Sequence, residues 1–109
     1  MQALRALPSV DRLLSSGPGA DLVATHPEGV FPLPDEVGFE QGAAIPMNYL
    51  TAEFALHTRA QLQPGETVLI HAGASGVGAA AIQLASMLGA RVIASAGSDD
   101  KRAYCRSLG

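Results

Sequence analysis

The sequence predicts an α/β fold in which two parallel strands flank one helix, and three observations support this. A short apolar run, Thr67–His71, is followed by closely spaced glycines and then by an alanine-rich stretch with helical spacing, Gly76–Leu88. A second apolar run, Arg91–Ala96, follows soon afterwards. Because the connection is short and both runs are apolar throughout, we expect a buried parallel pair joined by a crossover helix.

Composition excludes several classes of function. The chain of 109 residues has room for one modest core, and its net charge of −3 disfavours a nucleic-acid surface, which needs clustered Lys and Arg. One cysteine excludes an internal disulfide, and three scattered histidines give no metal-ligand cluster. The uncharged stretch Thr67–Ala90 changes from a strand to a turn to a helix pattern, so we expect no membrane span. A cytoplasmic location is the default expectation.

The N-terminal third has weak signals. Residues 1–20 end in a turn signature and remain unassigned, whereas Asp21–Thr25 and Gly29–Leu33 are typical of short extended pieces that prolines confine to edges or loops. A short helix is then predicted over Phe39–Ile45, started by Asp35 or Gly38 and stopped by Pro46.

A second helix is predicted from Met47 to about Gln61, with Pro46 as its first residue. Its apolar members share one face and predict a core-facing stripe, which comprises Met47, Leu50, Phe54 and Ala55. The polar residues of its first turn can face a pocket, and these are Asn48, Tyr49 and Thr51.

The remaining boundaries follow from turn and cap residues. Pro-Gly in Gln63–Glu66 predicts a type II turn before the first strand, and Gly89 ends the crossover helix. Ser98 or a neighbouring Asp caps a last helix over Lys101–Leu108.

The glycine-rich turn indicates a nucleotide site. Between a strand and a helix, glycines let backbone N–H groups approach a pyrophosphate, which the positive end of the helix dipole also favours. Read as G-x-G-x-x-G, the pattern has Gly73, Ser75 and Gly78, with Gly76 beside the serine. The spacing is one residue too tight for short-chain dehydrogenases, and no Gly-Lys-Ser/Thr follows for a P-loop. In the structural alternative, the glycines only let the alanine-rich helix pack on the strand.

The end of the second strand bears on the choice of nucleotide. An NAD site carries an acidic residue about 20 positions after the turn, where this chain has the small neutral residues Ser95–Ser98. Lys101 and Arg102 follow closely and suit a 2′-phosphate, so NADPH is favoured over NADH. Asp99 and Asp100 weaken this preference if they point inward.

An ordered series of short motifs spans about Asp21 to Gly109, namely Pro32-Leu33-Pro34, Phe39–Pro46, Leu50-Thr51-Ala52, Pro64–His71, Ala72–Gly78, Ala81–Ala85, Gly89–Ile93 and Ala96-Gly97-Ser98. This series resembles the medium-chain dehydrogenase/reductase superfamily, in its zinc-free quinone oxidoreductase (zeta-crystallin-like) branch. The resemblance implies a partial Rossmann fold, strand-helix-strand, preceded by two helices and the tail of a GroES-like β domain. Residues 21–37 would be the remnant of the GroES-like catalytic domain, and 38–109 the N-terminal part of the NADPH-binding domain with its leading helices.

The resemblance also implies an activity and a set of site residues. Such enzymes pass a hydride from NADPH to a quinone or an enone, without metal, and full-length members are expected to be homo-oligomers. The pyrophosphate would lie on the turn made by Gly73, Ala74, Ser75, Gly76, Val77 and Gly78. Ser98 and Lys101 would face the 2′-phosphate, and Thr51 would lie beside the nicotinamide on the substrate side.

Three alternatives stay open on the sequence. Enoylreductase domains of polyketide synthases share this stretch, so the substrate could be an enoyl thioester. The chain could also be a non-catalytic nucleotide-binding fragment or a packing module. Relative to the family it starts late and stops just past the second strand, so we expect a fragment without appreciable reductase activity of its own.

Overall fold

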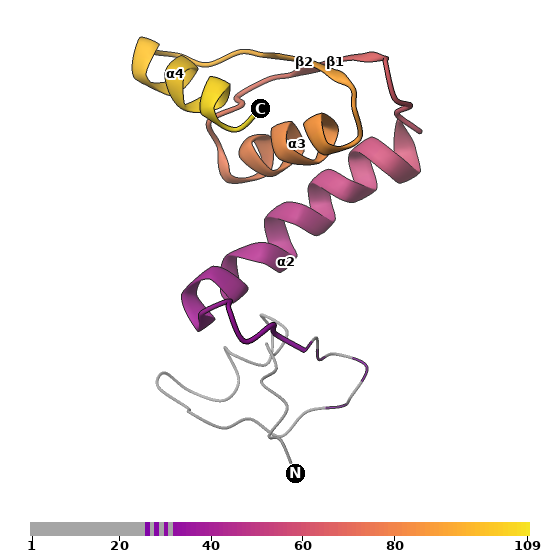
Figure 1. The fold of residues 1–109 in the computed structure, drawn as a ribbon, viewed down its shortest axis with the longest axis vertical. Coiled ribbons are helices and arrows are strands. Elements are labelled where there is room, and N and C mark those ends of the chain that lie inside the picture. Colours follow the sequence, from indigo (N-terminus) through magenta and orange to yellow (C-terminus); the bar gives the residue numbers. More distant parts are fainter. Residues whose placement is uncertain (1–25, 27, 29, 31) are drawn as a thin grey trace. The chain divides into compact units, whose positions relative to one another are not determined.

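The computed structural model describes residues 26, 28, 30 and 32–109, and it divides the chain into two compact units, 1–44 and 45–109. The elements follow the order α2 (Phe39–Glu53), η2 (Phe54–Arg59), β1 (Thr67–Ile70), α3 (Gly76–Met87), β2 (Arg91–Ala94) and α4 (Asp99–Ser107), as Figure 1 shows. The unassigned segment 1–20 and the expected extended piece Asp21–Thr25 lie outside the described residues. The predicted α/β class is confirmed.

The two strands pair in parallel, as predicted. Val68 lies opposite Val92 and Leu69 opposite Ile93, and the strands end at Ile70 and Ala94. The hydrogen-bond ladder continues past the carboxyl ends of the two strands. There the Ser95 N–H donates to the Ile70 carbonyl (3.0 Å), and the Gly73 N–H donates to the Ser95 carbonyl (2.9 Å). The strands are therefore shorter than the apolar runs, but pairing extends into the glycine turn.

The core lies between α3 and one face of this sheet. Small side chains line the buried side of α3, where Ala80, Ile82 and Ala85 are almost fully enclosed. The same hydrophobic cluster takes in Ile70 from β1 and Cys105 from α4. Alanines let a helix approach a sheet closely, so a short chain can bury a dense core here.

The C-terminal end of α3 matches the predicted stop at Gly89, and the N-cap at Ser75 was not predicted. Ser75 is the N-cap, and Gly89 follows the C-cap residue with a positive φ of 82°. The Gly89 N–H donates to the Ser86 carbonyl and the Ala90 N–H to the Ala85 carbonyl, both at 3.0 Å. This is the Schellman arrangement, which satisfies the last carbonyls of the helix.

The predicted break at Pro46 is wrong. α2 runs without interruption from Phe39 to Glu53 with Pro46 inside it, and the chain continues as the π-helix η2. Gly38 does serve as the start, because its N–H donates to the Gln41 side chain in the manner of a capping box. Proline removes only one helical hydrogen bond, and the helical residues on both sides of Pro46 keep the helix continuous.

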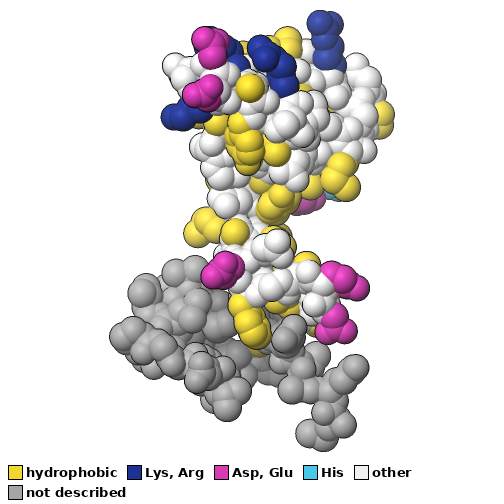
Figure 2. Space-filling model, turned by 60° about the vertical axis from the view of Figure 1, so that its left-hand side comes forward, with side chains coloured by type: hydrophobic (Ala, Val, Ile, Leu, Met, Phe, Trp, Pro, Cys, Tyr) yellow, Lys and Arg dark blue, Asp and Glu magenta, His cyan; other side chains and the backbone are white. Residues whose placement is uncertain are grey.

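The predicted core stripe of this helix is also wrong. Met47, Leu50 and Phe54 are 64%, 57% and 54% exposed, whereas Ala52 and Leu56 are buried. The buried face is set by a small residue, since Ala52 lets α2 approach the shared hydrophobic cluster more closely than methionine or phenylalanine could. Figure 2 shows hydrophobic side chains reaching the surface.

The connecting segments follow their turn chemistry. Gly65 has φ 85° and the Glu66 N–H donates to the Gln63 carbonyl (3.2 Å), which fits the predicted type II turn. Ser98 caps α4, which begins two residues earlier than expected. Across the described part of the chain, every helix is too short or too polar to cross a membrane.

Candidate nucleotide-binding site

The turn between β1 and α3 presents two backbone donors. Ala72 takes a left-handed conformation (φ 53°), and the Ser75 N–H donates back to the Ala72 carbonyl at 2.9 Å. The Ser75 hydroxyl then accepts from the Gly78 N–H at 3.1 Å. The N–H groups of Gly76 and Val77, in the first turn of α3, therefore remain without an acceptor inside the helix. They lie at the positive end of the helix dipole, which favours an anion.

Two of the predicted turn glycines have a packing role. A Cβ on Gly73 would meet Ala94, Cys105 and Ile82 at 2.9–3.0 Å, and one on Gly78 would run into the backbone of Ala72 and Gly73. The Gly73 N–H is already used in the strand ladder. Neither glycine leaves a free donor, so any contact of these two with a cofactor stays a prediction.

Gly76 has a different neighbour. A Cβ there would meet the side chain of Asn48, with the Oδ1 atom at 2.8 Å and the Cγ and Nδ2 atoms at 3.0 Å. Asn48 belongs to α2, so this helix reaches the turn at the residue that offers an N–H to an anion. A side chain at position 76 would force the amide of Asn48 to shift.

The residues beside Asn48 show how α2 is held and where Thr51 lies. The Tyr49 hydroxyl donates to Gln83 Oε1 of α3 at 2.9 Å, in a partly buried bond. The Thr51 hydroxyl donates to the Met47 carbonyl at 2.6 Å and is exposed. The predicted place of Thr51 beside a nicotinamide is untested by these contacts.

A polar pair at the carboxyl ends of the strands was missed by the sequence reasoning. His71 Nδ1 lies 3.0 Å from the Ser95 hydroxyl, and each residue directly follows its strand. Ligands of open parallel sheets bind outside this edge. Two strands of equal length that pair in register place the residues that follow them opposite each other. The closeness of His71 and Ser95 therefore follows from the register of the two strands, which the sequence alone does not give.

The first turn of α4 carries the residues predicted for the 2′-phosphate. The Ser98 hydroxyl accepts from the Lys101 N–H at 3.3 Å, and Lys101 is exposed. Asp99 forms an ion pair with Arg102, and its side chain is 94% exposed. The acidic residue therefore points into solvent and is paired, which leaves Lys101 as a cation at this helix start.

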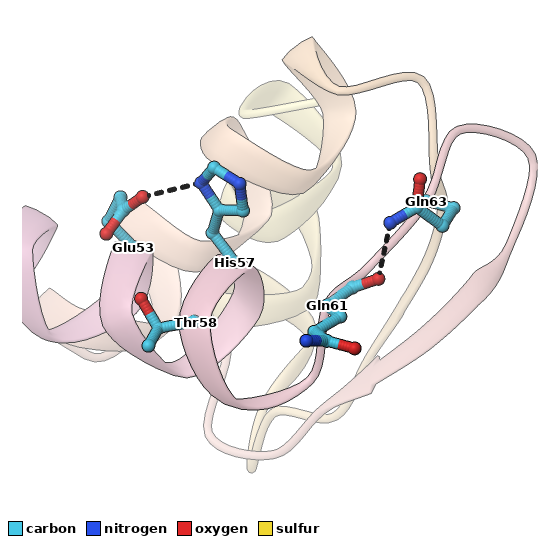
Figure 3. Close-up of a pocket in the computed structure, with 5 residues that line it drawn as sticks. All are labelled: Glu53, His57, Thr58, Gln61 and Gln63. Atoms are coloured by element: carbon cyan, nitrogen blue, oxygen red, sulfur yellow. Dashed lines mark hydrogen bonds and ion pairs between the residues drawn. The ribbon is translucent and has the colours of Figure 1, made fainter.

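A hollow in the described part of the chain lies elsewhere. It has a volume of about 580 Å³ and is lined by Glu53, His57, Thr58, Gln61 and Gln63, as Figure 3 shows. An adjoining apolar hollow takes in Leu84 and Leu88, which are at the opposite end of α3 from Ser75. The glycine turn is thus an open cradle outside both hollows.

Metal ligands do not gather in the described part of the chain, since none of its His, Cys, Asp and Glu residues form a group of three or more that could hold an ion. Its cysteine, Cys105, is buried against the turn. The chemistry that this arrangement offers is anion binding by backbone N–H groups and by Lys101.

Comparisons with known proteins agree with this geometry. The chain is 48% identical over 89 residues to lovastatin diketide synthase lovF of Aspergillus terreus, a match that covers 82% of this chain and 4% of that protein. Among solved structures, the CurK enoyl reductase superposes with a TM-score of 0.73 and 45% identity, over 78% of this chain and 25% of that chain. The quinone oxidoreductase from Thermus thermophilus, solved also with NADPH, superposes with a TM-score of 0.70 and 41% identity, over 75% and 28%.

A family model described as the selenocysteine synthase N terminal matches residues 4–31. This match covers well under half of the chain and falls almost wholly outside the described residues. The chain spans about 4% of the first curated relatives and about a quarter of the solved ones. Over the segment that it shares with them, it is similar in sequence and fold to quinone and enoyl reductases of the medium-chain dehydrogenase/reductase superfamily, as the motifs predicted.

Proposed function

We propose that the chain binds NADPH at the β1–α3 turn and forms part of a reductase that transfers hydride to a conjugated double bond. The observation that carries the proposal is the pair of N–H groups of Gly76 and Val77, which have no acceptor within α3 and lie at the start of this helix, directly after the turn that leaves β1. The Ser75 hydroxyl accepts a hydrogen bond from the Gly78 N–H only. The N–H groups of Gly76 and Val77 are therefore left to bind a pyrophosphate.

The α4 start supports a cofactor that carries a 2′-phosphate. Lys101 is an exposed cation in the first turn of α4, whose N-terminal N–H groups also favour an anion. The two acidic residues of this turn are exposed, and Asp99 is paired with Arg102, so the turn gives no buried carboxylate for the ribose of NAD. The similar quinone oxidoreductase from Thermus thermophilus was solved with NADPH, which supports the same choice.

We infer that the hydride acceptor is an enoyl thioester. The curated relatives are reducing polyketide synthases, and an enoyl reductase is among the most similar solved structures. A quinone is the second candidate, because the similar solved structures include quinone oxidoreductases. NADPH, when bound, supplies the hydride, while this chain contributes Gly76 and Val77 for the pyrophosphate and Thr51 on the nicotinamide side. Residues 38–109 would then form the N-terminal part of the NADPH-binding domain, with its leading helices.

The cofactor is tested by fluorescence titration of the 109-residue chain with NADPH and NADH. We expect tighter binding of NADPH, and we expect Lys101→Ala to weaken NADPH binding about tenfold while leaving NADH unchanged. Arg106→Ala is the matched control, because it removes an exposed cation from the last turn of the same helix. Equal affinity for the two nucleotides, or equal losses in the two variants, would argue against a 2′-phosphate site at Lys101.

The acceptor is tested separately, by ligand-observed NMR of the chain in the presence of NADP⁺. We expect selective line broadening for a short 2-enoyl thioester and none for a quinone of similar size. The reverse selectivity would favour the second candidate.

A further inference from the structure

The Asn48 side chain lies against the phosphate cradle, although no role is yet assigned to it. Its Oδ1, Cγ and Nδ2 atoms lie 2.8–3.0 Å from the position that a Cβ atom would take on Gly76. Gly76 carries one of the two N–H groups that α3 leaves for a ligand. The amide of Asn48 therefore sits at the edge of the same small surface.

The helix that carries Asn48 is attached to the rest of the unit by neighbouring residues. The neighbouring residue Tyr49 ties α2 to α3 through its 2.9 Å bond to Gln83. About one and two turns later along the helix, the buried side chains of Ala52 and Leu56 continue the same attachment. Asn48 and Thr51 are three residues apart and so share a face of α2. The helix thus presents two polar side chains in a row, with Asn48 at the glycine turn.

We infer that Asn48 is a cofactor-binding residue whose side-chain amide donates a hydrogen bond to the pyrophosphate beside Gly76. An asparagine amide has two N–H donors and one acceptor oxygen, so it can serve a phosphate oxygen and a protein partner together. It would act as a third donor next to the N–H groups of Gly76 and Val77. This inference rests on the proposed function and adds to it a residue from a different helix.

The competing reading is that Asn48 only fills space beside Gly76. The two readings differ for Asn48→Asp, which keeps the shape of the side chain but replaces the donor with a negative charge. A carboxylate next to a pyrophosphate repels it, and salt screens that repulsion. A role confined to contacts with protein groups would not give a loss of NADPH affinity that depends on salt.

The experiment measures NADPH affinity of the 109-residue chain and its thermal midpoint for three variants. We expect Asn48→Asp to weaken NADPH binding more than tenfold at low salt and less at high salt. Asn48→Ala should weaken binding about three- to tenfold, as expected for the loss of one hydrogen bond. The control Gln61→Glu makes the same change from amide to carboxylate in the hollow of Figure 3 and should bind within about twofold of the parent chain.

The outcomes separate this inference from the proposed function. If the parent chain binds NADPH and Asn48→Asp binds equally well with an unchanged thermal midpoint, Asn48 only fills space and the inference is overturned while the proposed function stands. If Asn48→Asp loses affinity only as far as its thermal midpoint falls, and salt has no effect, the inference is likewise overturned. If the parent chain does not bind NADPH, both are overturned.

Discussion

At the scale of single residues, the glycines of the turn divide by what surrounds them. Gly73 and Gly78 are enclosed by core side chains and by backbone, so packing alone explains them. Gly76 faces the movable side chain of Asn48 and carries a donor without an acceptor in the helix. Packing therefore accounts for glycine at two positions, where a cofactor contact stays a prediction, and the ligand argument rests on the third.

The enclosure of Gly78 leads to a prediction about stability. A methyl group there would contact the Ala72 carbonyl and the Gly73 Cα, neither of which can swing away as a side chain can. We expect Gly78→Ala to lower the free energy of unfolding by about 1–3 kcal/mol, measured by urea denaturation. Gly97→Ala is the control, because a Cβ there meets nothing within 4 Å, and its change should stay within about 0.5 kcal/mol. Similar losses in both variants would contradict the packing role.

The sequence predicted the turn residues well but missed the contacts between elements. Ser75, Gly76 and Val77 could be found from local spacing, since a strand, a turn and a helix form one continuous segment. The pair of His71 and Ser95 depends on strand register, and the contact of Asn48 with Gly76 depends on helix packing. Neither relation has a local pattern in the sequence.

At the scale of elements, the boundaries that caps determine were predictable. Ser75 and Gly89 bound α3, and Ser98 begins α4, each through a local hydrogen bond that its residue type favours. The failure at Pro46 has the opposite cause. A proline disfavours helix locally, but packing of the following turns, in which Ala52 and Leu56 are buried, stabilises α2 as one helix.

Two prolines in different settings are predicted to change the free energy of unfolding in opposite directions when each is replaced by alanine. Pro46 lies inside α2, so Pro46→Ala restores a helical N–H and should raise the free energy of unfolding by about 1–3 kcal/mol. Pro64 occupies the second position of the type II turn, where its fixed φ is favourable. Pro64→Ala should lower the free energy of unfolding by about 0.4–1 kcal/mol. Urea denaturation of both variants measures the signs, and a loss of stability in Pro46→Ala would contradict the cost assigned to a proline inside α2.

At the scale of the whole molecule, the sheet has one packed and one open face. Val68 and Val92 are paired in register and partly buried against the cluster that includes α3. Leu69 and Ile93 are paired one step further on the opposite face, and they are 57% and 48% exposed. The sheet therefore has an exposed apolar surface, which lies on the face that carries Leu69 and Ile93.

This asymmetry predicts that the same double substitution has different effects on the two faces. Threonine keeps the β-branched shape that strands favour, but it adds a hydroxyl that is costly only where it is buried without a partner. Val68→Thr with Val92→Thr should lower the free energy of unfolding by about 2–4 kcal/mol, whereas Leu69→Thr with Ile93→Thr should cost less than about 1 kcal/mol. Urea denaturation at low protein concentration, with circular dichroism as the readout, compares the two pairs. Equal losses of stability in the two double variants would mean that the face with Leu69 and Ile93 is also packed in solution. A smaller loss of stability for the valine pair would contradict the placement of the core between this sheet and α3.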